Sequence, residues 1–282
     1  MPLRDVGFLI LIAAIWGCNA VLTKIALGTV PPLFLSVLRF AVTLLVLVPF
    51  IKPIGMMWKP MLAVALLTGP LHFGLQFVGL HMAHDLAPMI IAMQLWIPAT
   101  VVLAAIFLNE KAPLARVLGM IVSLLGIGIL VFEPSVWVQM PAFGLVALAS
   151  VGYAGASIVM RKYGGLDPVQ AQAWLAIVTI PTLALASFTT ESGQVASIVK
   201  ATPIVWFAII FAAIISGLVA NVGMWRMVQR YEVSRTTPFS LLTPLIAIVL
   251  GVVWLGDPVA SQLLIGGSLA LGGVAVVALM RR

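Results

Sequence analysis

Residues 6–27 read VGFLILIAAIWGCNAVLTKIAL, a run of 22 residues with a single charge, on Lys24. About 20 mostly apolar residues are needed for a helix to cross a bilayer, so this run predicts a membrane-spanning helix. The run follows Arg4 as in a signal peptide, but no convincing cleavage site follows it, and we expect it to be retained. The whole chain has the same character, since 63% of its 282 residues are hydrophobic and 8% are charged. A water-soluble fold cannot bury that much apolar surface, so the solvent is lipid.

Nine further apolar runs of similar length are separated by charged or Pro/Gly-rich breaks. The ten predicted spans cover residues 6–27, 32–50, 61–81, 87–108, 114–132, 142–162, 169–188, 204–226, 236–255 and 261–280. The loops between them are short, so no soluble domain is expected. The predicted fold class is therefore an all-α membrane protein with ten transmembrane helices.

Lysine and arginine are distributed unevenly over the predicted loops. Ten spans place both termini on one side, and this side carries twelve of the 15 basic residues, whereas the other carries only Lys24 and Lys200. Because basic loops stay in the cytoplasm, both termini are expected to be cytoplasmic. This topology accounts for the net charge of +7 without nucleic-acid binding.

The chain also repeats itself, with an offset that drifts from 137 to 147 residues. Five spans in each half are an odd number, so the second repeat, 138–282, is inverted relative to the first, 1–137. Inverted repeats recur in secondary transporters, whose substrate site lies near the bilayer midplane where the repeats meet. The matched positions are Trp16 and Tyr153, Lys24 and Arg161, Gln76 and Asn221, Pro98 and Pro244, Leu108-Asn109-Glu110 and Leu255-Gly256-Asp257, Gly119 and Gly266, and Gly126 and Gly273.

Several of these motifs are similar to those of a known family. The order W-G-x-N at 16–19, Lys24, L-R-F at 38–40 and an acidic residue before a Gly-x6-Gly helix resembles the EamA-type members of the drug/metabolite transporter superfamily. The resemblance covers nearly the whole chain and both repeats. It implies a ten-helix exporter or exchanger of small metabolites in the bacterial inner membrane. Among its members, the chain looks most like the YddG exporters of aromatic and other neutral amino acids.

Aromatic and polar side chains near mid-depth form the predicted substrate site. Amides and imidazoles that face lipid are costly, so we expect these residues to face the protein interior or a wet cavity. Aromatic walls with a few amides suit a substrate with an apolar body and a polar end, such as an amino acid. The predicted residues are Trp16, Asn19, His72, Gln76, Gln94, Trp96, Tyr153, Ser157 and Asn221.

The same residues also allow plainer roles. The amides can simply bond neighbouring helices, and the tryptophans can pack or face lipid. His72 is the only histidine near a span centre, and three roles stay open for it: a satisfied interior side chain, a substrate contact, or the carrier of a coupling proton.

Two prolines and two cations complete the predicted machinery. Pro98 and Pro244 fall near the centres of the fourth and ninth spans, where each predicts a kink, a wall of the binding site, or both. Lys24 and Arg39 are possible charge-bearing residues. Arg39 is deep enough to need a partner or a route to water; it can snorkel outward, line the outer vestibule or attract a substrate carboxylate. Snorkelling or structural pairing is the preferred interpretation.

Several function classes are disfavoured by what the sequence lacks. No carboxylate lies at a span centre, which argues against proton exchange for organic cations, although an exporter of such small molecules stays the alternative. There is no phosphate-binding loop, no G-x-S-x-G and no H-E-x-x-H motif, so an ATPase or intramembrane protease is not expected, and nothing resembles the selectivity filter of a channel. With one cysteine we expect no metal site and no cofactor. We expect alternating access, in which the two repeats rock about the site, driven by a substrate gradient, protons or exchange.

Overall fold

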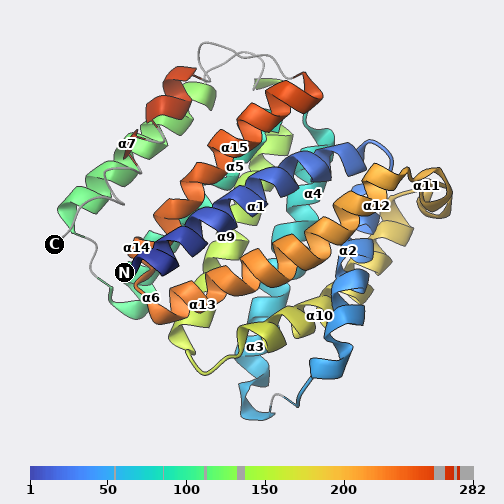
Figure 1. Ribbon diagram of the computed structural model, residues 1–282, viewed down its shortest axis with the longest axis horizontal. Helices are drawn as coiled ribbons and strands as arrows, with labels where there is room; N and C mark the ends of the chain where they lie inside the picture. Colours follow the sequence, from blue (N-terminus) through green and yellow to red (C-terminus); the bar gives the residue numbers. More distant parts are fainter. Residues whose placement is uncertain are drawn as a thin grey trace.

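The computed structural model describes residues 1–53, 55–84, 86–110, 113–131, 137–256, 264–269 and 272–273. Every regular element that it assigns in these ranges is helical (Figure 1). The elements of the first predicted repeat are α1 (Leu3–Leu27), α2 (Pro32–Leu47), η1 (Val48–Phe50), η2 (Gly55–Met57), α3 (Trp58–Leu66), η3 (Leu67–Gly74), α4 (Leu75–Met82), α5 (Leu86–Met93), α6 (Trp96–Leu108) and α7 (Leu114–Val131). Those of the second are α9 (Met140–Lys162), α10 (Pro168–Thr190), α11 (Gln194–Lys200), α12 (Pro203–Ile210), η4 (Phe211–Asn221), α13 (Val222–Arg230), α14 (Val233–Thr236), η5 (Thr237–Leu241), α15 (Leu242–Leu250) and η6 (Gly251–Leu255).

Six stretches within the described residues are long and apolar enough to cross a membrane. They are Leu3–Leu27, Pro32–Phe50, Gly55–Met82, Met140–Lys162, Pro168–Thr190 and Pro203–Arg230. The predicted fourth and ninth spans contain the shorter apolar helices Trp96–Leu108 and Leu242–Leu255. The fifth coincides with α7, and most of the tenth, 261–280, lies outside the described residues.

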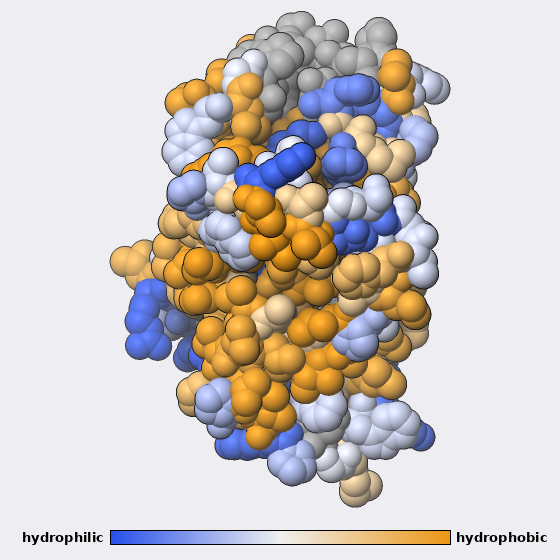
Figure 2. All heavy atoms as spheres, turned by 90° about the vertical axis from the view of Figure 1, so that its right-hand side faces the viewer, coloured by the Kyte–Doolittle hydropathy of each residue, from blue (hydrophilic) through white to orange (hydrophobic). Residues whose placement is uncertain are grey.

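The outside of the bundle is apolar, as expected for a protein in lipid. Figure 2 shows apolar side chains across the middle of one face, with most polar residues above and below. Large hydrophobic side chains such as Leu45, Leu185 and Phe188 are 65–74% exposed. Bulk water would not tolerate so many of them, whereas lipid chains solvate them without cost.

The two predicted repeats are not separate bundles in space. The most extensive helix contacts join α2 to α10, α1 to α15 and α6 to α9, and each of these pairs combines one helix from either repeat. In Figure 1 the dark blue α1 runs between the orange α12 and α13 on one side and the red-orange α15 on the other. The repeats interdigitate, so neither of them forms a separate body in this structure.

The contacts instead define two groups of helices. We call α1, the run α12–η4–α13 and α15 the α1 group, because α1 contacts each of the others extensively. We call α9, the run α3–η3–α4, α5 and α6 the α9 group, for the same reason. Each group takes one span from one repeat and two from the other. The sequence repeat pairs α1 with α9, the third span with the eighth and the fourth with the ninth, and so relates one group to the other.

The repeated motif after the fourth and ninth spans has a structural explanation. Asn109 ends α6 with φ 52°, and Gly256 ends η6 with φ 71°. Both residues adopt the left-handed conformation that stops a helix, which glycine and asparagine tolerate better than other residues. The matching positions therefore encode the same helix stop in both repeats.

A carboxylate from one repeat caps a helix of the other. The amides of Leu33 and Phe34, in the first turn of α2, donate to the carboxylate of Glu191, at 2.7 and 3.1 Å. No side chain of α2 itself caps this end. Glu191 follows α10, and a negative charge at a helix N-terminus is favourable, so this contact fixes α2 against α10.

Candidate functional site

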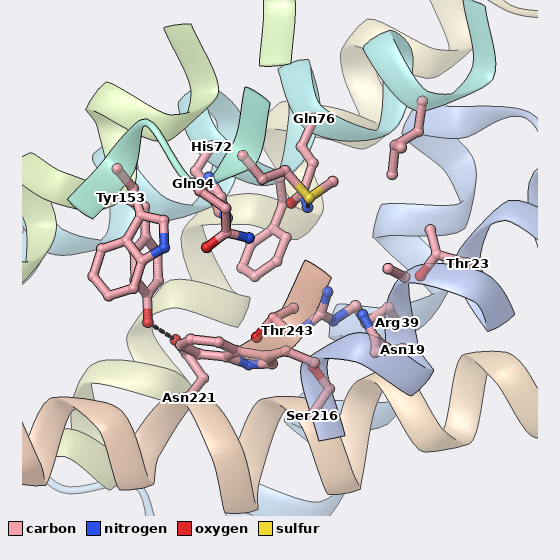
Figure 3. A pocket seen from close by; sticks show the side chains of 16 residues that line it. Asn19, Thr23, Arg39, His72, Gln76, Gln94, Tyr153, Ser216, Asn221 and Thr243 are labelled. Carbon is pink, nitrogen blue, oxygen red and sulfur yellow. Dashed lines mark hydrogen bonds between the residues drawn. The ribbon is translucent and has the colours of Figure 1, made fainter. Parts of the chain in front are cut away.

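A cavity lies between the α1 group and the α9 group, and both contribute to its walls (Figure 3). The free space between its walls, including the part open to solvent, is about 690 Å³, but water centres fit into only about 80 Å³ of it. The space is therefore narrow in this state. Its lining comprises Trp16, Asn19, Ala20, Thr23, Arg39, His72, Phe73, Gln76, Leu80, Met93, Gln94, Trp96, Tyr153, Ser216, Asn221 and Thr243.

The cavity extends from mid-depth toward one end of the bundle. On α1 it is lined from Trp16 to Thr23, about 10 Å along the helix axis, with no contribution from the first half of α1. On the third span it is lined from His72 to Leu80, again in the C-terminal part. Both stretches lead to the end of the bundle where α1 and α4 finish.

Three aromatic rings form a corner at the inner end of the cavity. Trp16, Trp96 and Tyr153 have centroids 5.1–6.2 Å apart, and each pair of ring planes meets at 83–88°. Such edge-to-face contacts are favourable and hold each ring at a fixed orientation. The side chains come from α1, α6 and α9, so the corner joins both repeats. It offers an apolar surface of fixed shape to a flat substrate.

A chain of hydrogen bonds connects Tyr153 of this corner to two other helices of the second repeat. The Tyr153 hydroxyl donates to Oδ1 of Asn221 at 2.7 Å, which Figure 3 shows as a dashed line. The Asn221 amide in turn donates to Oε1 of Gln172 at 2.8 Å. All three residues are buried. The bonds fix the Tyr153 ring from its far side and satisfy the Asn221 side chain.

Helix interruptions place several of the lining residues. The third and eighth spans contain the π-helical segments η3 and η4, at positions that the sequence repeat pairs. Pi-helical turns are rare and frequent at functional sites. His72 and Phe73 lie in η3, and Ser216 and Asn221 in η4, so each segment contributes two lining residues.

The two prolines mark further breaks. Pro98 has no N–H to donate to the carbonyl four residues earlier, that of Gln94. The chain breaks there, between α5 and α6, and Ile97 donates to the Gln94 carbonyl instead. Pro244 follows the transition from η5 to α15 in the same way. Neither proline lines the cavity, but Pro98 lies two residues after the lining residue Trp96, and Pro244 directly follows the lining residue Thr243.

The polar side chains of the α9 group are only partly satisfied. His72 donates from Nδ1 to the carbonyl of Ala149 at 2.8 Å. Gln94 donates to the carbonyl of Ile90 at 3.2 Å, and Gln76 donates to the sulfur of Met93 at 3.3 Å. The oxygens Oε1 of Gln76 and Gln94 are buried without a hydrogen-bond donor in the described part of the chain.

Arg39 differs from the interpretation preferred from the sequence. Its side chain is 2% exposed, so it does not snorkel to water. Its guanidinium lies 4.1 Å from the ring centroid of Phe73, a cation–π contact. Within the part of the chain that the structure describes, Nε and Nη1 have no hydrogen-bond acceptor and no carboxylate forms an ion pair with Arg39. The side chain projects into the cavity (Figure 3).

Besides the two prolines, two further predicted residues lie outside the cavity lining. The Ser157 hydroxyl is buried and donates to the carbonyl of Tyr153 at 2.9 Å, so it bonds its own helix. Lys24 donates to the carbonyls of Leu80 and Ala83 at the end of α4. Lys24 therefore joins the ends of α1 and α4 at the mouth of the cavity.

The structure also adds residues that the sequence reasoning missed. Thr23 lies four positions after Asn19, so the helical spacing that paired Trp16 with Asn19 also indicates it. Phe73, Ala20 and Leu80 lie on cavity-facing turns, but apolar residues carry no distinguishing pattern in an apolar chain. Met93, Ser216 and Thr243 are isolated in their spans, and nothing local marks them.

Another hollow of the molecule has fewer polar side chains in its lining. A hollow of about 910 Å³ between α3, α6 and α9 has a largely apolar lining, with Lys59 and Lys162 at its exposed rim. No group of three or more His, Cys, Asp or Glu that could hold a metal occurs in the ranges that the structure describes.

Known proteins resemble this chain in sequence and in fold. The model of the EamA-like transporter family matches residues 5–132 and 140–279. A probable amino-acid metabolite efflux pump of Salmonella typhimurium is 28% identical over 96% of this chain and 94% of its own length. A protein of the same description from Escherichia coli is 23% identical over 97% of this chain and 94% of its own. A solved structure with 22% identity has a TM-score of 0.75 over 98% of both chains, which shows a common fold.

Proposed function

Because the chain belongs to the EamA-like transporter family, we propose that it exports small metabolites, above all aromatic and other neutral amino acids, through the cavity between its two helix groups. The observation that carries the proposal is this cavity, in which an aromatic corner and unsatisfied amides converge from both helix groups. Such a lining suits a substrate with a ring and a polar end. The description of the bacterial relatives as amino-acid metabolite efflux pumps supports the same substrate class.

Alternating access is the proposed mechanism. The α1 group and the α9 group meet at the cavity, and the sequence repeat relates them to each other. Two repeat-related units can exchange conformations, which opens the site first to one side and then to the other. The moving bodies are thus the two helix groups, each a mixture of both repeats. Because basic loops stay in the cytoplasm, the proposal puts both termini there. The cavity leads to the opposite end of the bundle, where α1 finishes, and so opens toward the outside in this conformation.

An exporter of organic cations is the competing function. A cationic substrate needs a negative partner in a low-dielectric site. No carboxylate is among the lining residues found in the described chain, whereas a buried arginine is. The electrostatics therefore favour a zwitterion or an anion over a cation.

Counterflow in proteoliposomes tests the function. Purified protein is reconstituted into vesicles loaded with unlabelled L-phenylalanine, and uptake of the labelled compound is followed. Saturable, transient accumulation is expected, because a carrier exchanges substrate across the bilayer. Uptake that does not saturate indicates a pore, and absence of exchange for every neutral amino acid tested contradicts the proposed substrate class.

Replacing one ring of the aromatic corner tests the site. Trp96→Ala is expected to lower the rate of L-phenylalanine exchange at least about tenfold, because it removes a buried ring and both of its edge-to-face contacts. The matched control is Trp254→Ala, at a side chain that is 58% exposed on the outside of the bundle. Equal rates for both variants, with equal yields of monodisperse protein, contradict the site.

A further inference from the structure

Arg39 is the most unusual residue of the cavity. A buried guanidinium normally has a carboxylate or several carbonyls around it, because an isolated charge is costly in a low-dielectric interior. Here the guanidinium makes a cation–π contact with the ring of Phe73, but Nε and Nη1 have no acceptor among the described residues. A guanidinium has two edges that bind a carboxylate through two parallel N–H groups, Nε with Nη2 and Nη1 with Nη2. Each edge of Arg39 contains one of the donors Nε and Nη1, and no carboxylate among the described residues pairs with Arg39.

The cavity also holds unsatisfied acceptors. Oδ1 of Asn19 and Oε1 of Gln76 and Gln94 are buried, and no donor in the described ranges reaches them. For Gln94 the identity of the oxygen is fixed, since the other end of its amide donates to a carbonyl, which can only accept. A buried polar atom without a partner carries a free-energy penalty that a bound ligand removes. The cavity lining therefore offers donors for one anion and acceptors for one group rich in N–H donors.

These two deficits correspond to the two ends of a zwitterion. We propose that Arg39 binds the carboxylate of the transported substrate, and that the amide oxygens of Asn19, Gln76 and Gln94 accept hydrogen bonds from its ammonium group. The inference rests on the proposed function, in which the aromatic corner takes the substrate side chain. In Figure 3 Arg39 and Asn19 lie on one side of the cavity, and Gln94 and Tyr153 lie on the other. Arg39 thereby becomes the specificity-determining residue that accepts amino acids and rejects amines.

The cation–π contact with Phe73 stabilises the charge of Arg39 when no substrate is bound. The ring of Phe73 lies under the guanidinium, and it packs edge-to-face on Phe40 at 5.3 Å. This cation–π contact uses no hydrogen-bond acceptor, so Nε and Nη1 keep N–H groups that can bind a carboxylate. Lysine at this position has no planar fork and can neither stack nor bind in the same bidentate manner.

A series of matched ligands tests the assignment. Binding of L-phenylalanine, 3-phenylpropionate (no ammonium), L-phenylalaninamide (no carboxylate) and phenethylamine (no carboxylate) is measured by calorimetry on purified protein. The wild-type protein is expected to bind the two carboxylates and to discriminate against the amide and the amine. Arg39→Gln is expected to weaken both carboxylates about 10- to 100-fold, with little effect on the other two. Arg39→Lys is expected to bind the two carboxylates more weakly than the wild-type protein and more tightly than Arg39→Gln.

Variants at other positions separate the two ends of the substrate. Gln94→Leu is expected to weaken L-phenylalanine more than 3-phenylpropionate, because it removes an acceptor for the ammonium group only. Arg226→Gln, the same exchange at an exposed arginine outside the cavity, is expected to keep the wild-type pattern. Size-exclusion profiles and melting temperatures without ligand show whether each variant is folded, and Arg39→Lys keeps the test valid if Arg39→Gln is not.

The outcomes distinguish this inference from the proposed function. If the wild-type protein binds L-phenylalanine and both Arg39 variants bind it equally well, the carboxylate site is wrong while amino-acid transport stands. If it binds 3-phenylpropionate in an Arg39-dependent way but no amino acid, the carboxylate site stands and the proposed substrate class is wrong. If the protein prefers phenethylamine over every carboxylate, both the carboxylate site at Arg39 and the proposed substrate class are wrong.

Discussion

At the scale of single residues, Tyr153 connects the aromatic corner to the polar interior of the second repeat. Its ring contacts Trp16 and Trp96, while its hydroxyl donates to the buried Asn221. One side chain thus provides an apolar surface toward the cavity and a hydrogen bond away from it. The two roles can be separated, because phenylalanine keeps the ring and removes only the hydroxyl.

Tyr153→Phe is expected to lower the free energy of unfolding by about 0.5–2 kcal/mol, since it leaves Oδ1 of Asn221 buried without a donor. The aromatic corner remains, so L-phenylalanine binding is expected to change little. Thermal unfolding in detergent measures the first effect and calorimetry the second. Tyr163→Phe, at a side chain that is 39% exposed, is the control. Equal melting temperatures for the two variants contradict a structural role for this hydrogen bond.

Much of the cavity lining is foreseeable from the sequence, because polar side chains are conspicuous in an apolar chain. Asn19, Gln76, Gln94 and Asn221 stand out for that reason, and the structure brings them to one cavity. Ser157 shows the limit of the argument, since a hydroxyl can also bond the carbonyl four residues earlier in its own helix. The spacing of four residues from Tyr153 fits a side chain that lines the cavity and one that bonds its own helix equally well, so the sequence does not distinguish them.

At the scale of helices, close approach in the α9 group depends on glycine. A Cβ atom on Gly152 of α9 would lie 2.8 Å from the backbone carbonyl oxygen of Leu67, where η3 begins. Backbone atoms cannot move aside as a flexible side chain can. Gly152 therefore allows α9 to lie directly against the π-helical segment that carries His72.

Gly152→Ala is expected to lower the free energy of unfolding by about 1–3 kcal/mol, because the added methyl group forces α9 away from η3. Gly144→Ala is the matched control in the same helix: nothing lies within 4 Å of the added atom there. Since alanine favours a helix over glycine, this control is expected to be neutral or slightly stabilising. Melting temperatures of the two variants measure the difference, and a Gly152→Ala protein as stable as the control contradicts the close packing.

Apolar length predicts most of the spans, but it does not predict their interruptions. The six longest apolar stretches in the described chain coincide with predicted spans. Proline at positions 98 and 244 indicates a break near the centre of two further spans, because the missing N–H is visible in the sequence. The π-helical segments η3 and η4 are different, since they arise from packing between spans, and no local pattern marks where a helix widens.

At the scale of the whole molecule, the sequence indicates that the chain is duplicated but not how the copies pack. Periodicity shows which residues avoid water or lipid, and it carries no information about which helix lies against which. The expectation that each repeat forms one rocking body therefore differs from the contacts, which pair α1 with α15 and α9 with α6 across the repeats. Each of the two helix groups draws on both repeats, and the cavity lies between them.

Polar contacts close the end of the bundle where α1 begins. At the end of α9, Arg161 forms an ion pair with Glu110 at 3.0 Å and donates to the carbonyl of Gln229 in α13 at 2.8 Å. The side chain of Gln229 donates back to the carbonyl of Leu166 at 2.7 Å. The Arg161–Glu110 ion pair lies within the α9 group, whereas the two bonds of Gln229 join the α9 group to the α1 group opposite the open end of the cavity. In alternating access they must break when the site turns toward this end.

Arg161→Ala is expected to shift the equilibrium toward the state that opens at this end. Loss of the partly exposed bond from Arg161 to the carbonyl of Gln229, which crosses between the groups, corresponds to about 1 kcal/mol, or roughly a fivefold change in population. The measurement is the rate at which an impermeant thiol reagent labels Ser216→Cys, a cavity position, in protein whose native Cys18 is replaced by serine. In inside-out vesicles the labelling rate is expected to rise several-fold, and Lys162→Ala, at the adjacent exposed cation, is expected to leave it unchanged. A rate that does not rise with Arg161→Ala means that these bonds do not hold the end of the cavity closed.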